Sequence, residues 1–322
     1  MEYVQLTGSG ISVSRLCLGA MTFGDQIDEK EGIRCVDHAL DAGVNFFDTA
    51  NRYTDGKSEE ILGKALAGKR DKVILATKVG NHVPGCDHER GSSRAHILRQ
   101  VESSLRRLKT EYIDIYYLHS PDAVTPVEET VETMDSLVRS GKVRYIGTSN
   151  FAAWQACRMH YEAKGAHRAS PVVAQMVYNL LTRGLEQEFI PFLKALGLSL
   201  VVYNPIAGGL LTDKYAEKKP LENTRFTLSK MYADRYWNED NLAAWDAVRS
   251  IAQDAGISML ELAMRWIYST GNVESILTGF SSLSQLEANL KTLDAGKLSP
   301  EVMQACDKVW QHLSGTRFRY NR

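Results

Sequence analysis

The chain has 322 residues, of which 44% are hydrophobic and 24% charged, and its 38 lysines and arginines nearly balance 39 aspartates and glutamates. This composition is typical of an ordinary globular protein and argues against disorder. The net charge of −1 provides no basic surface for nucleic acid or for an anionic membrane. We therefore expect neither of these among its partners.

Targeting and redox signals are consistent with a cytoplasmic protein. The first ten residues lack a basic segment followed by an apolar one, so we expect no secretory signal. The most apolar stretch, Gly197–Leu211, is too short to span a bilayer and is interrupted by Asn204 and Pro205. Five scattered cysteines suggest reduced thiols. Cys86–Glu89 loosely resembles a metal cluster, but no second ligand pair accompanies it, and we expect no metal.

Short apolar runs alternate with amphipathic helical runs along the whole chain. Near-continuous apolar runs of this length are typical of parallel strands buried on both faces. The predicted strands are Arg15–Ala20, Val44–Asp48, Val73–Lys78, Ile113–His119, Arg144–Ser149, Val172–Val177, Leu200–Asn204 and Ser275–Gly279. The predicted helices are Lys30–Ala42, Ser58–Ala67, Arg94–Leu108, Val127–Ser140, Trp154–Lys164, Gln187–Leu196, Asn241–Ala255 and Met259–Ser269.

Eight alternating units predict a (β/α)8 TIM barrel, formed as a single domain over residues 1–322. Tyr3–Leu6 and Ile11–Val13 flank a glycine-rich turn and predict a short β-hairpin before the first barrel strand. A doubly wound dinucleotide-binding sheet is the main rival. It would need G-x-G-x-x-G at a strand-to-helix turn, and the sequence has none.

Polar residues stand where the predicted strands end, and in a barrel these ends form the active face. An acid, a phenol, an amine and an imidazole gather there: Asp48, Tyr53, Lys78 and His119. Ser149, Asn150, Gln175, Tyr203 and Gly279 end the remaining strands. Each residue alone has a structural explanation, such as a helix cap or a core histidine. Their coincidence at one barrel mouth favours a site.

The combination points to carbonyl reduction. A phenol is a poor acid at neutral pH, but a nearby ammonium stabilises the phenolate, and a carboxylate holds that ammonium in place. Tyr53, Lys78 and Asp48 would therefore form a tuned general acid, while His119 would orient a carbonyl oxygen. Because no side chain donates hydride, a nicotinamide cofactor is implied.

Two loops offer a place for that cofactor. The loop after the seventh strand has glycines through which backbone amides could approach a pyrophosphate, and a loop leading into a short helix follows the eighth strand; both are usual phosphate sites in this fold. Tyr203 could stack on the nicotinamide, and Ser149, Asn150 and Gln175 could bind its carboxamide. The first loop contains Asn204, Pro205, Ile206, Ala207, Gly208, Gly209 and Leu210, and the second contains Ser281 and Ser282, with the helix running through Asn289.

These residues resemble the aldo-keto reductase superfamily, through Gly43–Ala50, Tyr53, Ser58-Glu59, Lys78, Leu118-His119 and Gly147–Asn150. The resemblance covers the chain from about residue 1 to its end. It implies an NADPH-dependent reductase of aldehydes or ketones, with Tyr53 as proton donor, Asp48 and Lys78 tuning it, and His119 orienting the substrate. Asp48, Gly279 and Asn289 are also expected against the cofactor. Ser281, Ser282, Gln285 and Arg225 would hold its 2′-phosphate, since the lysine or arginine of many relatives is missing.

Within the superfamily, the chain is most similar to the aflatoxin-aldehyde and succinic-semialdehyde reductase branch, through motifs such as Arg235-Tyr236-Trp237 and Ser281–Asn289. Ile206 and Asp213 depart from that branch, which leaves the exact substrate open. The resemblance implies that Arg235 and Arg322 face the acidic end of a small carbonyl substrate.

Two alternatives stay open. Lys78 could form a Schiff base, as in an aldolase. The chain could also be a regulatory subunit resembling the potassium-channel β-subunits, which share this barrel. A homodimer remains an alternative to a monomer.

Overall fold

Eight parallel strands close into a barrel, in which β10 is hydrogen-bonded to both β9 and β3. The computed structural model describes residues 1–83, 91–222 and 224–315. The barrel confirms the predicted fold class and all eight predicted strands. These are β3 (Leu16–Gly19), β4 (Phe46–Asp48), β5 (Ile74–Val79), β6 (Ile113–Leu118), β7 (Val143–Ser149), β8 (Val173–Val177), β9 (Ser199–Tyr203) and β10 (Ser275–Thr278).

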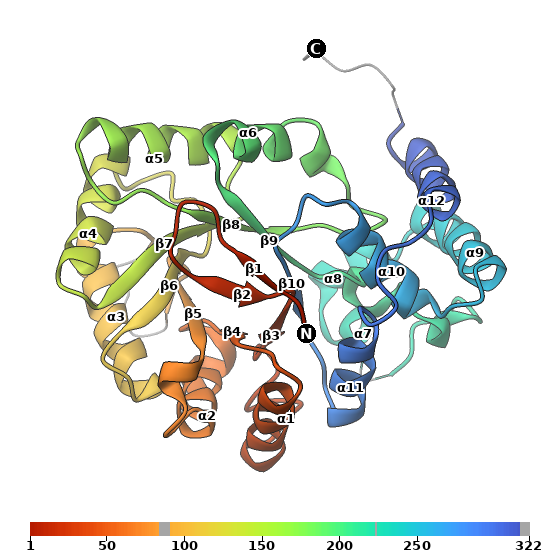
Figure 1. Cartoon of the computed structure of the whole chain (residues 1–322), viewed down its shortest axis with the longest axis horizontal. Coiled ribbons are helices and arrows are strands. Elements are labelled where there is room, and N and C mark those ends of the chain that lie inside the picture. The colour runs from red at the N-terminus through yellow and green to blue at the C-terminus, as the bar shows by residue number, and fades with distance from the viewer. Residues whose placement is uncertain (84–90, 223, 316–322) are drawn as a thin grey trace.

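Helices surround the strands, as Figure 1 shows. Their apolar faces pack on the barrel; α10, for example, buries Leu262, Trp266 and Ile267 completely. The helices that match the predicted ones are α1 (Glu29–Asp41), α2 (Lys57–Ala65), α3 (Arg94–Leu108), α4 (Val127–Arg139), α5 (Ala153–Gly165), α6 (Phe189–Leu196), α9 (Glu239–Asp254), α10 (Met259–Ser269) and α11 (Leu283–Lys291).

The seam between β10 and β3 joins the two ends of the chain. Ile276 pairs with Leu16, and its backbone nitrogen donates to the Arg15 carbonyl at 2.8 Å. The Ser275 hydroxyl donates to the Ser14 carbonyl, also at 2.8 Å, across 261 positions of sequence. The barrel is therefore closed only when its first strand, β3, pairs with its last strand, β10.

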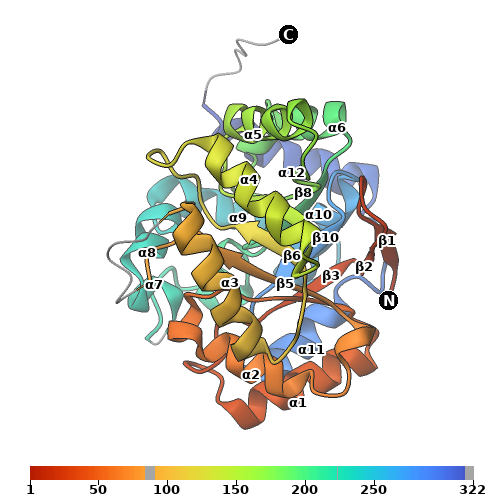
Figure 2. The same cartoon turned by 90° about the vertical axis from the view of Figure 1, so that its left-hand side faces the viewer.

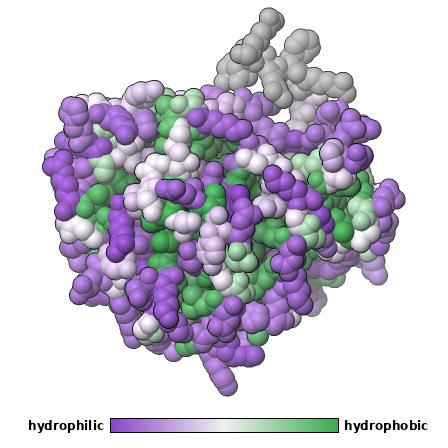
Figure 3. Space-filling model, in the orientation of Figure 1, coloured by the Kyte–Doolittle hydropathy of each residue, from purple (hydrophilic) through white to green (hydrophobic). Residues whose placement is uncertain are grey.

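The predicted hairpin is confirmed as β1 (Tyr3–Gln5) and β2 (Ser12–Ser14), and it covers the amino-terminal end of the barrel (Figure 1). Leu6 and Val13 are fully buried against the barrel interior. The Thr7 amide donates to the Ser199 hydroxyl at 2.7 Å and fixes the hairpin to β9. Figure 3 shows this face of the molecule, where polar side chains alternate with smaller apolar areas.

Two short helices, α7 (Arg225–Leu228) and α8 (Lys230–Tyr236), lie at the opposite end of the barrel from the hairpin (Figure 2). They form part of the long segment after β9. The sequence analysis assigned no helix there, nor over α12 (Pro300–Leu313), which packs on α9. Across the described ranges, every helix is too short or too polar to cross a membrane.

Candidate active site

The carboxyl ends of β4, β5 and β8 bring three polar side chains together inside the barrel. Asp48, Lys78 and Gln175 are each at most 2% exposed. Tyr53 reaches the same point from a 3₁₀ turn that follows β4, where Thr54 and Asp55 adopt left-handed backbone angles. The strand ends thus assemble Asp48, Tyr53 and Lys78 as predicted.

Lys78 is the centre of this cluster because its ammonium has three acceptors. It forms an ion pair with Asp48, donates to the Thr49 carbonyl at 2.9 Å, and donates to the Tyr53 hydroxyl oxygen at 3.2 Å. An ammonium has three N–H groups, so all of them are used. The amide of Gln175 donates to the other Asp48 oxygen at 2.9 Å, a contact that the sequence analysis did not predict. Lys78 and Gln175 therefore fix the orientation of the Asp48 carboxylate.

This arrangement leaves the Tyr53 proton available to another acceptor. Since the Tyr53 oxygen accepts from Lys78, its own O–H points elsewhere. Burial raises the pKa of Tyr53, and the charge of Lys78 opposes that rise. Burial also opposes the charge on Lys78, but Asp48 and Tyr53 outweigh it and raise the pKa of Lys78. The ammonium therefore stays charged beside the phenol at neutral pH.

His119 follows β6 and packs edge-on against Tyr53, with ring centroids 5.7 Å apart. Burial and, to a smaller extent, the charge of Lys78 lower the pKa of His119 to about 3. A neutral imidazole can donate one hydrogen bond but cannot act as a strong acid at neutral pH. Its Nδ1 has no hydrogen-bond partner within the described ranges. His119 is therefore suited to orienting a group beside the Tyr53 hydroxyl.

A second layer of contacts holds the elements that carry Tyr53 and Lys78 in place. Glu59 of α2 is fully buried and accepts from the Thr77 hydroxyl at 2.6 Å and from Nε of Arg107 at 2.6 Å. Thr77 precedes Lys78 in β5, and Arg107 belongs to α3. Glu59 belongs to the Ser58-Glu59 motif, from which no role for this carboxylate was predicted. Its contacts tie the helix that follows Tyr53 to the strand that carries Lys78.

Side chains at the ends of β7 and β9 form a connected network. The Tyr203 hydroxyl donates to Oδ1 of Asn150 at 2.6 Å, and Nδ2 of Asn150 donates to the His119 carbonyl at 2.9 Å. Nδ2 also lies 3.1 Å from the hydroxyl of the buried Ser149. Burial raises the pKa of Tyr203 to about 12, opposed by the exposed Arg235 beside it. Arg235, on α8, therefore lies beside Tyr203 at the barrel mouth.

The amides of the loop after β9, which were predicted to approach a pyrophosphate, form hydrogen bonds within the loop itself. The backbone nitrogens of residues 207–212 all donate within the loop, mostly to backbone carbonyls, and that of Gly208 donates to the Asn204 side chain at 2.6 Å. Ala207 and Leu210 are fully buried. The expected residues Pro205, Ile206 and Gly209 lie in this same folded loop. These amides therefore stabilise the fold of the loop, and side chains beside it are further candidates for binding an anion.

Two cationic side chains lie over glycines of the two predicted cofactor loops: Lys214 over Gly209 and Arg225 over Gly279. A Cβ built on Gly209 would lie 3.2 Å from Nζ of Lys214, and one on Gly279 would lie 3.7 Å from Nη2 of Arg225. Burial lowers the pKa of Lys214, and the charge of Arg225 lowers it further. In the part of the chain that the structure describes, neither cation has an ion-pair partner. Such an uncompensated pair fits a diphosphate, and the sequence analysis missed Lys214.

The residues expected at the 2′-phosphate surround the first turn of α11. Ser282 caps this helix and accepts from the Gln285 amide at 3.3 Å, while the Gln285 side chain accepts from the Ser281 amide at 2.9 Å. Asn289 donates to the Gly279 carbonyl at 3.4 Å and so joins the helix to the end of β10. Ser281, Ser282 and Gln285 are thus brought together, whereas Arg225, the fourth residue predicted at the 2′-phosphate, lies over Gly279.

Two expectations lie outside the described residues. These are the role of Arg322 at the acidic end of the substrate and the polar run Cys86–Glu89, where no metal was expected. Within the described ranges, no cluster of three or more histidine, cysteine, aspartate or glutamate side chains could hold a metal ion.

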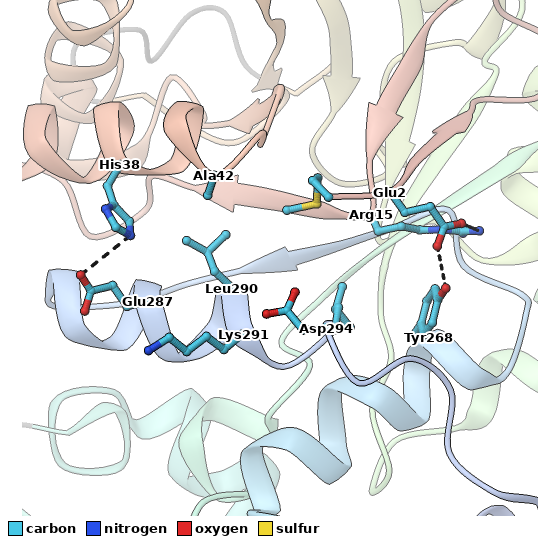
Figure 4. A pocket seen from close by; sticks show the side chains of 11 residues that line it. Glu2, Arg15, His38, Ala42, Tyr268, Glu287, Leu290, Lys291 and Asp294 are labelled. Carbon is cyan, nitrogen blue, oxygen red and sulfur yellow. Dashed lines mark hydrogen bonds and ion pairs between the residues drawn. The ribbon is translucent and has the colours of Figure 1, made fainter.

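A cavity of about 620 Å³ lies away from the catalytic cluster, between the ends of α1 and α11 (Figure 4). Glu2, Arg15 and Tyr268 line one side of it, and His38 faces Glu287 across the other at 3.8 Å. Arg15 precedes β3, so this cavity belongs to the amino-terminal side of the barrel. The cluster of Asp48, Tyr53 and Lys78 therefore lies at the opposite end of the barrel from this cavity.

Comparison with known proteins places this geometry in a family. The family model described as "Aldo/keto reductase family" matches residues 15–311. A probable voltage-gated potassium channel subunit beta of Oryza sativa is 39% identical over 321 residues, 97% of each chain. Aflatoxin B1 aldehyde reductase member 2 of Rattus norvegicus is 35% identical over 91% of this chain and 83% of its own length. The aldo-keto reductase YhdN of Bacillus subtilis is 37% identical over 89% and 87%.

Proposed function

Because the chain belongs to the aldo/keto reductase family of oxidoreductases, we propose that it reduces an aldehyde or ketone to an alcohol, with hydride from NADPH and a proton from Tyr53. The observation that carries this proposal is the Lys78 ammonium held between Asp48 and the Tyr53 hydroxyl. Burial and the charge of Lys78 lower the pKa of His119 to about 3, so its imidazole is neutral at neutral pH, which supports Tyr53 over His119 as the proton donor. Tyr53 is then the acidic group of the cluster.

The protein residues have separate tasks in the reaction. The bound nicotinamide supplies the hydride that forms the new C–H bond. Tyr53 donates its proton to the carbonyl oxygen, which has gained the electron pair of the C=O bond. Lys78 stabilises the resulting phenolate, and Asp48 keeps Lys78 charged and in place. His119 holds the carbonyl oxygen beside Tyr53, and the phenolate regains a proton from solvent.

Several residues would hold the cofactor. Lys214 and Arg225 would bind its pyrophosphate, because their charges repel each other and are otherwise uncompensated. Tyr203 would stack on the nicotinamide, and Ser149 and Asn150 would bind its carboxamide. Ser281, Ser282 and Gln285 would face the 2′-phosphate at α11, which supports NADPH as the preferred form.

The experiment is NADPH oxidation with a panel of aldehydes, diketones and sugars, comparing the parent chain with Tyr53→Phe. We expect turnover by the parent and at least about a hundredfold loss in the variant, since the general acid is removed and the ring is kept. The affinity for NADPH should change little. Equal turnover by both proteins would refute the assignment of Tyr53.

The charge state of Lys78 argues against the aldolase alternative. A Schiff base requires a neutral amine, whereas Asp48 and Tyr53 raise the pKa of Lys78 and engage all three of its N–H groups. Borohydride added together with a carbonyl substrate should therefore leave Lys78 unmodified. Covalent trapping of the substrate on Lys78 would support the aldolase instead.

A second candidate is a regulatory role, because the rice relative named as a channel β-subunit aligns over 97% of both chains. A carbonyl substrate and a protein partner are compatible on one barrel. Tight NADPH binding without turnover across the whole panel would favour the regulatory role over catalysis.

A further inference from the structure

The first turn of α11 already has an acidic neighbour. Glu31, on α1, accepts a hydrogen bond at 3.3 Å from the backbone nitrogen of Leu283, the first residue of α11. The Glu31 side chain is 31% exposed. Its carboxylate therefore lies at the positive end of the helix, where an anion is stabilised.

This position is fixed by the packing of α1 against α11. The two helices are in direct contact. Figure 4 shows a second link between them, from His38 to Glu287, further along both helices. Before α1, the Thr22 hydroxyl donates to the Phe280 carbonyl at 2.7 Å and joins the loops that follow β3 and β10. Glu31 is thus held beside Ser282 and Gln285 by contacts on both sides.

Resting on the proposed function, we propose that Glu31 is a specificity-determining residue that reduces the preference for NADPH over NADH. NADPH differs from NADH by the 2′-phosphate, which is expected at this turn. The Glu31 carboxylate occupies one of the helix amides that such a phosphate would use, and its negative charge repels the phosphate. NADH has a hydroxyl group in place of the 2′-phosphate, so neither the occupied helix amide nor the charge of Glu31 opposes its binding.

Arg34 forms an ion pair with Glu31, but this pair does not remove the repulsion between the Glu31 carboxylate and a 2′-phosphate. Its Nη1 donates to Oε2 of Glu31 at 2.9 Å, whereas Oε1 faces the Leu283 amide. The carboxylate accordingly lies between the guanidinium and the helix turn. Arg34 is also 59% exposed, so solvent screens its charge strongly.

The test measures equilibrium binding of NADPH and of NADH to the full chain by quenching of tryptophan fluorescence. We expect the two dissociation constants of the parent to differ by less than about tenfold. Glu31→Gln keeps a hydrogen-bond acceptor and removes the charge, so NADPH should bind about fivefold more tightly and NADH as before. Glu29→Gln is the matched control on the same helix, because Glu29 is paired with Lys64, and it should change neither value.

A double variant, Glu31→Gln with Arg34→Met, separates the carboxylate from its partner. If the carboxylate is responsible, the tighter binding of NADPH persists; if Arg34 released from Glu31 makes the contact, it disappears and the proposal is wrong. An unchanged ratio of the two constants in Glu31→Gln, or an equal shift in both, also overturns it. Failure of the parent to bind either cofactor would instead refute the proposed function.

Discussion

Thr77 and Glu59 are joined by a buried hydrogen bond of 2.6 Å that connects the strand of Lys78 to the helix that follows Tyr53. Glu59 also binds Arg107 of α3. One carboxylate therefore links three elements around the active site. Its loss should affect both stability and the position of Tyr53 relative to Lys78.

For Glu59→Gln, we expect the free energy of unfolding to fall by about 1–3 kcal/mol, because Arg107 loses its charged partner at a partly buried site. The value of kcat for aldehyde reduction should fall several-fold, while the affinity for NADPH stays nearly constant. Urea unfolding and steady-state kinetics measure the two effects. Glu60→Gln, at an exposed position of the same helix, is the control and should match the parent.

Acid should destabilise the folded chain through His119. Its pKa is about 3 in the folded chain against an ordinary value of 6.5, so the unfolded chain binds more protons between these values. The neutral imidazole makes its full contribution to the free energy of unfolding above pH 6.5, and this contribution decreases as the pH falls towards 3. In His119→Gln, the loss of unfolding free energy between pH 7 and pH 5 should be smaller by about 1–2 kcal/mol. An identical loss in both proteins would contradict the burial of a neutral imidazole.

Removal of either uncompensated cation should weaken cofactor binding. Lys214→Met and Arg225→Met should each raise the dissociation constants of NADPH and NADH by about tenfold or more, the scale of a charge-assisted hydrogen bond. Both cofactors contain the pyrophosphate, so both should be affected alike. Lys218→Met is the control, because that ammonium is paired with Asp246 on the surface. Weakening of NADPH alone would place these cations at the 2′-phosphate.

Arg235 should select for a substrate with a carboxylate. Arg235→Met should raise KM for a small aldehyde with a terminal carboxylate by about tenfold and leave a nitrobenzaldehyde nearly unaffected. Because Arg235 also lies beside Tyr203, damage to the cofactor site would appear as parallel losses on both substrates. Unchanged kinetics on both would leave Arg235 without a role in substrate choice.

The barrel could be predicted because each strand is buried on both faces and so forms an apolar run that ends at a turn. The strand ends then defined where Asp48, Lys78 and His119 had to meet. The helix α12 could not be found in this way, because it lies beyond the eighth unit and fully buries few residues, among them Cys306. Its Ser299-Pro300 start was the available signal, since the Ser299 side chain caps the helix.

Lys214 and Glu31 were not predicted as site residues, for different reasons. Lys214 follows a glycine-rich loop and could have been noticed as a cation near an expected phosphate. Glu31 contacts a residue 252 positions away, and nothing in the sequence indicates that their helices touch. The hydrogen bonds of the amides after β9 could not be predicted either, because glycine indicates backbone freedom and only the folded loop shows which acceptors its amides reach.

The seam between β10 and β3 has a consequence for synthesis and truncation. Until Ser275–Thr278 has been made, β3 and β9 both remain unpaired edges of an open sheet. Unpaired strand edges invite pairing with other chains. A nascent or truncated chain that ends before residue 275 should therefore aggregate, even though it contains seven of the eight barrel strands and the whole Asp48, Tyr53 and Lys78 cluster. Synthesis of Ser275–Thr278 is thus the step after which β3 and β9 no longer offer unpaired edges to other chains.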